Sequence, residues 1–383
     1  LQDTLYQTYN AHNYVIYSSI LNAFILIPYI VFFTPSGFIS DKFSKPKVMF
    51  WTAAAAIPIM ILITICYYQG LFWGAYGLTL LLGLQSAINS PAKYGHIKEL
   101  FSQANIAKAN AYTQTMTILA ILAGTFLFTF MFSHLISHLL VSHSPVTKSA
   151  ILHAFAPIGF ALILFSSLET FTTLFLAKQS AADPNSRYEI KKFITLKYVS
   201  PYWKHISSNK TIFICILSLS LYWAANQVIL VSYGAFLKTH IPNVSTLFAQ
   251  GSIAIAGIGI LFGALYAGKI SEGYIETGII PVASAAITVC LLLLAHVTNK
   301  PSILILVLCY GFVGGMFIVP LNSLIQYHAN KKYLGKVLAG NNFCQNIAML
   351  TFLFGNTVAT LYNVNSVDIL HSLFVLFFVV DGC

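Results

Sequence analysis

The sequence predicts an all-α polytopic membrane protein, and three features predict it: a scarcity of charge, long apolar runs and a one-sided distribution of cations. Hydrophobic residues make up 57% of the 383 residues and charged residues only 8%, whereas soluble domains carry roughly 25% charged residues. A helix needs about 20 apolar residues to cross a bilayer, and the chain contains eleven such runs. Barrel strands would be about half as long and would alternate polar with apolar residues, which these runs do not.

The eleven runs are divided by one long polar stretch. They cover residues 14–33, 48–68, 71–90, 110–132, 150–177, 211–237, 245–268, 278–297, 301–321, 338–361 and 365–380. The stretch 178–210 separates a first helical half, 1–177, with five runs from a second half, 211–383, with six. This near symmetry predicts two six-helix halves, holding spans 2 to 6 and spans 7 to 12. The first span would then be missing upstream of Leu1, and the last span, which stops at Cys383, would be truncated.

Almost all Lys and Arg residues lie on one side of the predicted membrane. Of the 20, 17 follow the odd-numbered runs, and only Lys148, Lys238 and Lys300 lie on the other side. Cytoplasmic loops carry such an excess of cations, so we expect the central loop 178–210 to be cytoplasmic. Topology then accounts for the net charge of +10, and too little soluble surface remains to favour nucleic acid as a partner.

The cysteines give no sign of disulfide or metal chemistry. Five of the six lie singly inside apolar runs and the sixth ends the chain, which is neither a disulfide framework nor a Cys-x-x-Cys site. The chain also lacks the phosphate-binding Gly-x-x-x-x-Gly-Lys-Ser/Thr loop. We therefore predict no metal, no cofactor and no catalytic residue.

Two segments of the chain repeat one another. The matching pairs, 231 residues apart except for the prolines at 229, are Asn110 with Asn341, Gln114 with Gln345, Gly124 with Gly355 and Pro91 with Pro320. A polar pair four residues apart in an apolar helix, followed by glycine at the same spacing, is difficult to attribute to chance. The repeat favours two related halves, one of the known designs of transporters.

The loop after the first run carries a recognisable motif. It reads Gly37-Phe38-Ile39-Ser40-Asp41-Lys42-Phe43-Ser44-Lys45-Pro46-Lys47. This resembles the signature loop of the major facilitator superfamily, with Ser44 in place of a glycine and Pro46 interrupting the basic pair. The resemblance implies the major facilitator fold and a conformational latch formed by Gly37, Asp41, Lys42, Lys45 and Lys47.

The chemistry of this loop is consistent with a latch. Gly37 permits close helix approach, and Asp41 at the membrane edge can accept hydrogen bonds from the N-terminus of a neighbouring helix. The corresponding stretch of the second half, 264–269, keeps Gly268 and Lys269 without an acid. We therefore expect a one-sided latch. The alternative is an ordinary basic loop.

Two further blocks narrow the resemblance. The first block is Ser90-Pro91-Ala92-Lys93-Tyr94-Gly95, and the second runs from Gly314 to Gln326 and continues as Gln345-Asn346-Ile347-Ala348-Met349-Leu350. Both resemble the bacterial lysophospholipid transporter family over nearly the whole chain. The resemblance implies a facilitator in the bacterial inner membrane that moves lysophospholipid, such as lysophosphatidylethanolamine, to the inner leaflet for reacylation. Such proteins are sometimes fused to an acyltransferase and acyl-ACP synthetase, which are the implied partners.

The chain departs from this family in its charged residues. The family would place carboxylates where this chain has Gln114 and Gln345, and an arginine near Leu230. The loss of anions and a cation together is electrostatically coherent, because an unpaired charge in a membrane is costly.

Polar residues of the apolar runs are the candidates for the substrate path, because such residues usually face the interior of a bundle. The candidate residues are Pro91, Lys93, Tyr94, Asn110, Gln114, Asn226, Gln227, Pro320, Asn322, Asn341, Gln345 and Asn346. The amides could hydrogen-bond the phosphate or glycerol of a headgroup, and Lys93 could bind phosphate. For any single amide the alternative is a bond between helices, and for Lys93 it is a lysine that reaches from a helix end to the interface.

Three functions remain open at this point. The first is a lysophospholipid transporter that works by alternating access. The second is a major facilitator transporter of a soluble small molecule or drug. The third is a non-transporting membrane part of a phospholipid acyltransferase fusion. The acyltransferase of this family resembles enzymes with a His-x-x-x-x-Asp motif, which this chain lacks, so we predict that the chain itself is not an enzyme.

Overall fold

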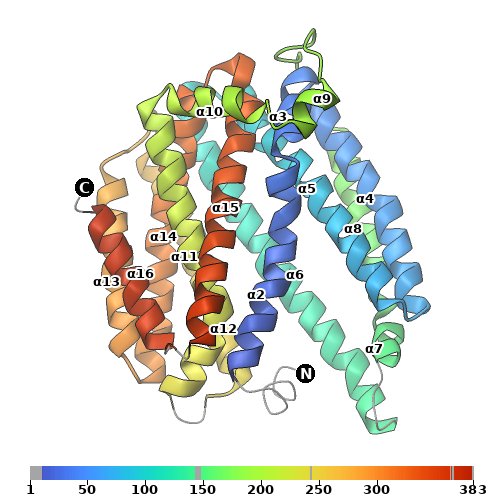
Figure 1. Cartoon of the computed structure of the whole chain (residues 1–383), viewed down its shortest axis with the longest axis vertical. Helices are drawn as coiled ribbons and strands as arrows, with labels where there is room; N and C mark the ends of the chain where they lie inside the picture. Colours follow the sequence, from blue (N-terminus) through green and yellow to red (C-terminus); the bar gives the residue numbers. More distant parts are fainter. Residues whose placement is uncertain (1–10, 143–147, 242–243, 363, 365, 382–383) are drawn as a thin grey trace.

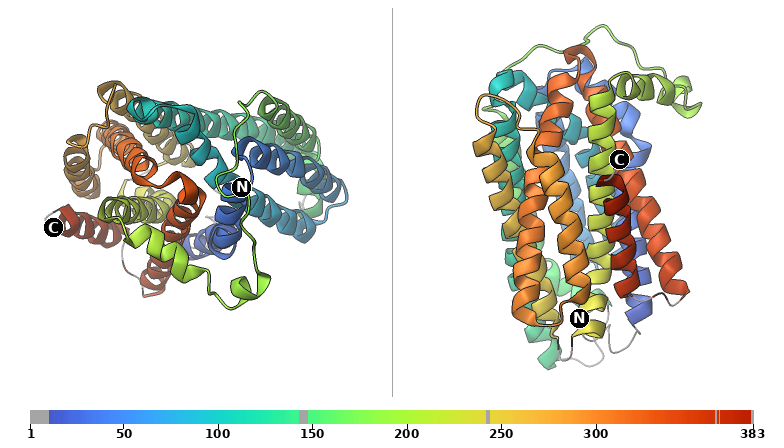
Figure 2. Two further views of the ribbon diagram at one scale, coloured as in Figure 1. Left: turned by 90° about the horizontal axis from the view of Figure 1, so that it is seen from above. Right: turned by 90° about the vertical axis from the view of Figure 1, so that its left-hand side faces the viewer.

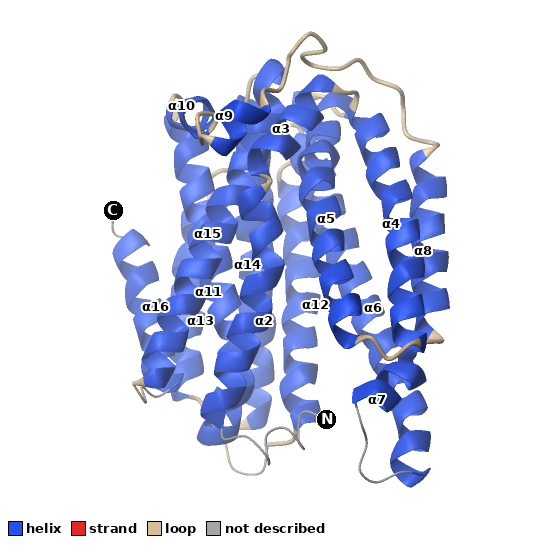
Figure 3. Ribbon diagram, turned by 45° about the vertical axis from the view of Figure 1, so that its right-hand side comes forward, coloured by secondary structure: helices blue, strands red, loops and turns tan. Residues whose placement is uncertain are grey.

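The computed structural model describes residues 11–142, 148–241, 244–362, 364 and 366–381. In this part of the chain every regular element is helical (Figure 3). The elements before the central loop are α2 (Ala11–Val31), α3 (Phe33–Lys42), α4 (Lys45–Tyr68), α5 (Phe72–Leu100), the 3₁₀ turn η1 (Gln103–Asn105), α6 (Ile106–Ser142), α7 (Lys148–Phe155) and α8 (Ile158–Thr173). The central loop holds α9 (Ile190–Ile194) and α10 (Val199–Ser207), and the elements after it are α11 (Lys210–His240), α12 (Thr246–Ile270), α13 (Ile279–His296), α14 (Lys300–His328), the 3₁₀ turn η2 (Lys331–Tyr333), α15 (Leu334–Leu361) and α16 (Ser366–Asp381).

The predicted all-α membrane fold is confirmed, but the count of eleven spans is not. Among the described residues, six helices are long and apolar enough to cross a membrane, or seven if α2 and α3 form one bent span. The helices α5 and α15 have 29 and 28 residues and are long enough. Polar side chains, such as Lys93 in α5 and Asn341 in α15, lower their hydropathy.

Prolines explain where the helices break. The axes of α2 and α3 differ by 51° around Phe32, because Pro35 has no N–H to donate to the carbonyl of Val31 and its ring crowds that carbonyl. The predicted run 150–177 is wrong as a single helix. It forms α7 and α8, which are separated at Ala156 and Pro157, since a residue before proline disfavours the helical conformation.

Polar residues fix the start of several long helices. The side chains of Asn209, Ser245 and Asn299 accept hydrogen bonds from backbone N–H groups in the first turns of α11, α12 and α14, at 3.2, 3.2 and 2.9 Å. These groups would otherwise have no partner at a helix N-terminus. These N-terminal caps therefore define where α11, α12 and α14 begin within a mostly apolar sequence.

The helices stand side by side in two groups that meet along two seams. At one seam α6 packs against α12, and at the other α15 packs against α2 and α3. The central loop, with α9 and α10, lies at one end of the bundle, the top in Figure 1. We call this end the central-loop end and the opposite one the far end. Seen from above, the segment with α9 runs along the outer edge of the bundle (Figure 2).

Four glycines bring the backbones of α12 and α14 into direct contact. A Cβ atom added to any of them would collide with main-chain atoms of the other helix. The glycines, which we call the glycine seam, are Gly259, Gly263, Gly311 and Gly315. Small residues permit this close packing where lipid provides no hydrophobic driving force.

The structure corrects the register of the internal repeat. The helices α5 and α14 begin at residues 72 and 300 and end at 100 and 328, so the offset is 228 rather than 231. The turns η1 and η2 and the starts of α6 and α15 show the same offset. Asn110 therefore corresponds in position to Leu338 and not to Asn341, about one helical turn away. Lys108 and Lys336 do correspond.

Candidate functional site

Asp41 joins the two halves at the central-loop end. It lies in the last turn of α3 and is only 1% exposed, and its carboxylate accepts hydrogen bonds from the backbone N–H groups of Gly335, at 2.6 Å, and Lys336, at 3.2 Å. These groups begin α15, where the positive end of the helix dipole also favours an anion. The close approach requires glycine on both sides, because an added Cβ at Gly37 would lie 3.0 Å from the Cα of Lys336, and one at Gly335 would lie 2.6 Å from an oxygen of Asp41.

The second half also has an acid at its seam, which the expected one-sided latch does not include. Glu272 follows Gly268 by four residues, as Asp41 follows Gly37, and its carboxylate lies 2.6 Å from the ammonium of Lys108 in α6. The hydrogen bond from Lys108 holds the pKa of Glu272 below its usual range. An added Cβ at Gly268 would meet Ala111, and one at Gly37 would meet Ala339. Ala339 lies 228 residues after Ala111, which is the offset of the internal repeat. The two seams are thus related by the internal repeat.

The two contacts differ in strength. Asp41 is buried and bonds to main-chain groups, whereas Lys108 and Glu272 have exposed fractions of 40% and 61%. Exposed ion pairs gain little and are screened by salt. The contact between α3 and α15 is therefore the stronger of the two, and the stronger candidate for a latch.

Three further polar contacts join the halves near the same end. Asn110 of α6 and Gln326 of α14 exchange two buried amide hydrogen bonds, at 3.0 and 2.8 Å. The ammonium of Lys98 in α5 donates to main-chain carbonyls at the C-terminus of α14, where a cation is favoured by the helix dipole. Asn342 of α15 donates to the hydroxyl of Ser90 in α5 at 2.8 Å. Together with Asp41 and Glu272, these contacts close the central-loop end.

The three lysines of the predicted latch loop have different surroundings. Lys45 is buried and forms an ion pair with Glu99 at the end of α5. The ammonium of Lys42 lies 5.3 Å from the ring centroid of Phe38. Lys47 lines an apolar groove of about 520 Å³ between α3, α4 and α5. Of these lysines, Lys45 is therefore the one that ties α4 to α5.

A deep apolar cavity of about 480 Å³ lies where α6 faces α11, α12, α13 and α14. Its walls include residues 118–129 of α6 and 223–233 of α11, which lie well along these helices from the central-loop end. The lining is mainly Ile, Leu, Val, Ala and aromatic, and none of the lining residues is charged. The cavity therefore suits an apolar occupant with few polar groups.

The polar lining of the cavity includes two tyrosine hydroxyls without partners. Tyr233 and Tyr310 are 2% and 8% exposed, both line the cavity, and neither hydroxyl has a hydrogen-bond partner in the structure. A buried hydroxyl without a partner is costly, and because both oxygens are themselves buried, a ligand reaches them only when the side chains of the cavity wall shift. Neither tyrosine was among the predicted site residues, because a tyrosine in an apolar run can as easily face lipid as a cavity.

Of the predicted substrate-path residues, Asn226 and Gln227 line this cavity. The side chain of Asn226 donates to the carbonyl of Tyr222 at 2.8 Å, and that of Gln227 donates to Asn22 of α2 at 3.0 Å. Each of these amides keeps an oxygen that can accept a further hydrogen bond.

The remaining predicted residues lie outside the cavity. Pro91 and Pro320 are buried within α5 and α14, and Gln114 is buried in α6. In α15 and the end of α14 the amides bond mainly within their own helix: Gln345 donates to Asn341 at 2.9 Å, Asn346 to the carbonyl of Asn342 at 2.7 Å and Asn322 to that of Ile318 at 3.1 Å. Lys93 donates to Thr117 at 3.3 Å and lies 5.6 Å from the ring centroid of its neighbour Tyr94. The structure does not bring this set together.

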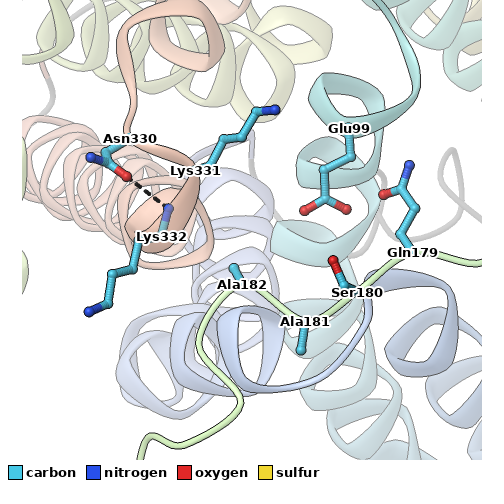
Figure 4. Close-up of a pocket in the computed structure, with 8 residues that line it drawn as sticks. All are labelled: Glu99, Gln179, Ser180, Ala181, Ala182, Asn330, Lys331 and Lys332. Carbon is cyan, nitrogen blue, oxygen red and sulfur yellow. Dashed lines mark hydrogen bonds between the residues drawn. The ribbon is translucent and has the colours of Figure 1, made fainter.

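A second pocket, of about 650 Å³, opens at the central-loop end (Figure 4). Glu99, Gln179 and Lys331 line it from α5, the start of the central loop and η2. The second carboxylate oxygen of Glu99 and the amide oxygen of Gln179 are buried without partners. None of the predicted substrate-path residues lines this pocket. Among the described residues, no group of three or more His, Cys, Asp or Glu is placed to hold a metal ion.

Two groups of helices, joined by polar contacts at one end and enclosing an apolar cavity, define a polytopic α-helical protein with the architecture of a membrane transporter. Residues 4–353 match the model of the Major Facilitator Superfamily, so the chain belongs to that family. Solved structures agree on the fold: the Escherichia coli fucose:proton symporter FucP aligns with a TM-score of 0.72 at 13% identity over 97% of this chain and 94% of that chain. For the human organic anion transporter MFSD10 the TM-score is 0.71 at 15% identity over 96% and 83%.

Curated relatives are more similar in sequence. The chain is 27% identical over 347 residues to a protein of Citrobacter koseri called "Lysophospholipid transporter LplT", covering 89% of this chain and 79% of the relative. A protein of Escherichia fergusonii with the same name is 27% identical over 345 residues, with the same coverage. The chain is therefore an integral membrane transporter of the Major Facilitator Superfamily, and its named relatives handle a lipid.

Proposed function

We propose that this transporter moves lysophospholipid, with lysophosphatidylethanolamine as a model substrate, to the inner leaflet of a bacterial inner membrane. The names of the curated relatives support the substrate class. The single structural observation that carries the proposal is the apolar cavity with its two unpartnered tyrosine hydroxyls. An acyl chain can lie against its apolar walls, since apolar burial is favourable.

In this proposal the headgroup binds the polar groups of the cavity. The hydroxyls of Tyr233 and Tyr310 donate hydrogen bonds to phosphate oxygens, and the amide oxygens of Asn226 and Gln227 accept from the ammonium or glycerol hydroxyl of the lipid. A headgroup that enters the protein needs such replacements for water, because an unpaired polar group costs several kcal/mol. A soluble sugar would need many more polar partners than this lining offers, so the lipid is favoured over a soluble solute.

The latches supply the alternating access. The central-loop end, which the distribution of cations predicts to be cytoplasmic, is closed here by Asp41, Glu272 and the amide pair of Asn110 and Gln326. We propose that these contacts part when the halves 1–177 and 211–383 rock against each other and release the lipid to the inner leaflet. Gln114, Lys93 and the amides of α15 would then border the path in the opened state. An acyltransferase, as a partner or fused domain, would consume the product.

The test compares tyrosine variants in proteoliposomes. Labelled lysophosphatidylethanolamine should move between leaflets faster with the protein than in empty vesicles. Tyr233→Phe and Tyr310→Phe each remove one hydroxyl without changing shape. Because a hydrogen bond to a charged group contributes about 1.5–3 kcal/mol, each should slow transport about 10- to 150-fold at low substrate concentration.

Tyr222→Phe is the matched control. Its hydroxyl is also buried without a partner, but Tyr222 does not line the cavity, so its transport rate should match the parent. Lipid movement equal to that of empty vesicles would refute the substrate. If all three tyrosine variants transported like the parent, the cavity would not be the headgroup site.

A further inference from the structure

The segment from Glu189 to Lys197 in the central loop exposes an unusual amount of apolar surface. Ile190, Ile194 and Leu196 are 69%, 72% and 69% exposed. This segment lies outside the membrane-spanning helices, at the outer edge of the bundle and at its central-loop end (Figure 2). Three large aliphatic side chains would therefore lie in water unless something covers them, which is unfavourable.

The same short segment is basic. Lys191, Lys192 and Lys197 alternate with the exposed aliphatic residues and are themselves exposed. The one acid of the segment, Glu189, lies 2.5 Å from the ammonium of Lys192. Even with that pair neutralised, the patch is positive. Aliphatic residues interleaved with lysines are the pattern of segments that lie in the interface of a membrane and attract anionic lipids.

The segment is held in place from its other side. Phe193 stacks on Phe32, at the break between α2 and α3, with ring centroids 6.5 Å apart. The rings of Tyr188 and Tyr198 stack at 4.8 Å, and the hydroxyl of Tyr198 accepts a hydrogen bond from the backbone N–H of Glu189 at 2.9 Å. The aliphatic side chains are thus presented outward by an ordered turn, because the aromatic side chains occupy the inward face.

The backbone of this turn carries strain. Leu196 has a φ of 55°, the left-handed region that residues other than glycine, and occasionally Asn or Asp, seldom adopt. Such strain persists only where the surroundings enforce it, and it is found at sites of contact and switching. Here the left-handed residue follows the end of α9, and its leucine side chain is exposed instead of packed in a core.

We propose that the segment 189–197 docks onto anionic phospholipid in the leaflet at the central-loop end. Ile190, Ile194 and Leu196 enter the boundary between headgroups and acyl chains, and the three lysines bind lipid phosphates. A lipid surface fits better than a protein partner because the segment lies at the rim of a bundle that already crosses the bilayer. This inference does not depend on which substrate the protein carries.

Docking would act on the stronger latch through the neighbouring parts of the central loop. The backbone N–H of Asp183 donates to the carbonyl of Asp41 at 2.8 Å, and the hydroxyl of Tyr202 in α10 donates to the carbonyl of Thr34 at 2.5 Å. Tyr188, which flanks the docking segment, also bonds to the hydroxyl of Thr34 at 3.1 Å. Docking of the segment would therefore help to hold α3 in the position that it has in this structure.

The experiment measures where Ile194 lies in lipid nanodiscs that contain the full chain. Ile194→Trp is compared with the parent in nanodiscs of phosphatidylcholine alone and of phosphatidylcholine with phosphatidylglycerol, using lipids brominated near the headgroup and the aqueous quencher acrylamide. We expect the emission that this variant adds to that of the four native tryptophans to be quenched by brominated lipid, and more strongly with phosphatidylglycerol. The emission added by Ser180→Trp, in the pocket at the central-loop end, should be quenched by acrylamide alone.

Charge removal separates this docking from a general charge effect. Lys191→Gln, Lys192→Gln and Lys197→Gln together, added to Ile194→Trp, should lower the ratio of docked to undocked segment about 100-fold in anionic nanodiscs. The control removes three exposed lysines elsewhere in the loop, by K178Q, K204Q and K210Q. This control should change the ratio of docked to undocked segment little. An equal loss in both triple variants would overturn the proposal. Quenching of Ile194→Trp by acrylamide alone would also overturn the proposal. That result would indicate that the segment lies in water, where a protein partner could bind it.

Discussion

Replacing Asp41 by alanine is the sharpest test of the latch between α3 and α15. The change removes two hydrogen bonds, at 2.6 and 3.2 Å, from a carboxylate that is 1% exposed. A charge-assisted hydrogen bond contributes about 1.5–3 kcal/mol, and loss of a helix N-terminal cap costs about 0.5–2 kcal/mol. Since removal of the buried charge recovers part of its desolvation cost, we expect a net weakening of about 2–3 kcal/mol, or about 30- to 150-fold in the opening equilibrium.

Hydrogen exchange can read this opening directly, because the amides that exchange are the donors themselves. In nanodiscs, the backbone N–H groups of Gly335 and Lys336 should exchange about 30- to 150-fold faster in Asp41→Ala than in the parent. Asp41→Asn keeps one acceptor oxygen but loses the charge, so it should fall between the two. Amides in the middle of α15 should exchange at the parental rate, since their bonds lie within the helix.

The second seam provides the control. Glu272→Gln removes the exposed ion pair with Lys108 and lies on the other side of the bundle, so exchange at Gly335 should stay close to the parent. Unchanged exchange at Gly335 in Asp41→Ala would refute the assignment of Asp41 as a latch. Equal acceleration in Asp41→Ala and Glu272→Gln would refute the ranking of the two seams.

Two other predictions concern stability, and a third concerns pH dependence. Asn110→Leu should lower the free energy of unfolding in detergent by about 1–3 kcal/mol, because it leaves the amide of Gln326 buried and unpaired. The double variant with Gln326→Leu should recover most of that loss. A double variant as unstable as the single one would contradict the pairing. Gly263→Ala should destabilise by about 1–3 kcal/mol through overpacking, measured by thermal unfolding, whereas Gly234→Ala, whose added methyl meets open space, should not. Burial, followed by the neighbouring lysines, holds the pKa of His205 below its ordinary value. The stack of this ring on Tyr333 of η2 should thus be fully present above about pH 6.5 and be lost as the pH falls through the lowered pKa. Amide exchange in α10 should become faster over the same pH range. His205→Phe should abolish this pH dependence.

The fold was largely predictable because apolar runs long enough to cross a bilayer leave the chain few alternatives to helices. The hydropathy pattern did not predict helix breaks that a single proline causes within an apolar run. Pro157 divides α7 from α8, although the run itself is uninterrupted in hydropathy. Neither the offset of 228 nor the bend at Phe32 could be obtained from composition, because both depend on where helices begin.

The site was less predictable because its contacts join residues far apart in the chain. The motif around Asp41 identified a residue that does contact a helix N-terminus, while its role as a latch stays a prediction. Glu272 lies just beyond the stretch 264–269 that corresponds to the loop motif, although its spacing from Gly268 repeats that of Asp41 from Gly37. For Tyr233 a local signal does exist, since it follows Asn226 by seven residues and therefore lies on the same face of α11.

The glycine seam determines which movements a spectroscopic label can detect. Because the main chains of α12 and α14 touch at four points, neither helix can slide or rotate against the other without a collision of backbone atoms. A pair of spin labels placed on these two helices should give the same distance distribution in every state of the transport cycle. Informative pairs must span a latch, with one label on α6 or α3 and the other on α12 or α15.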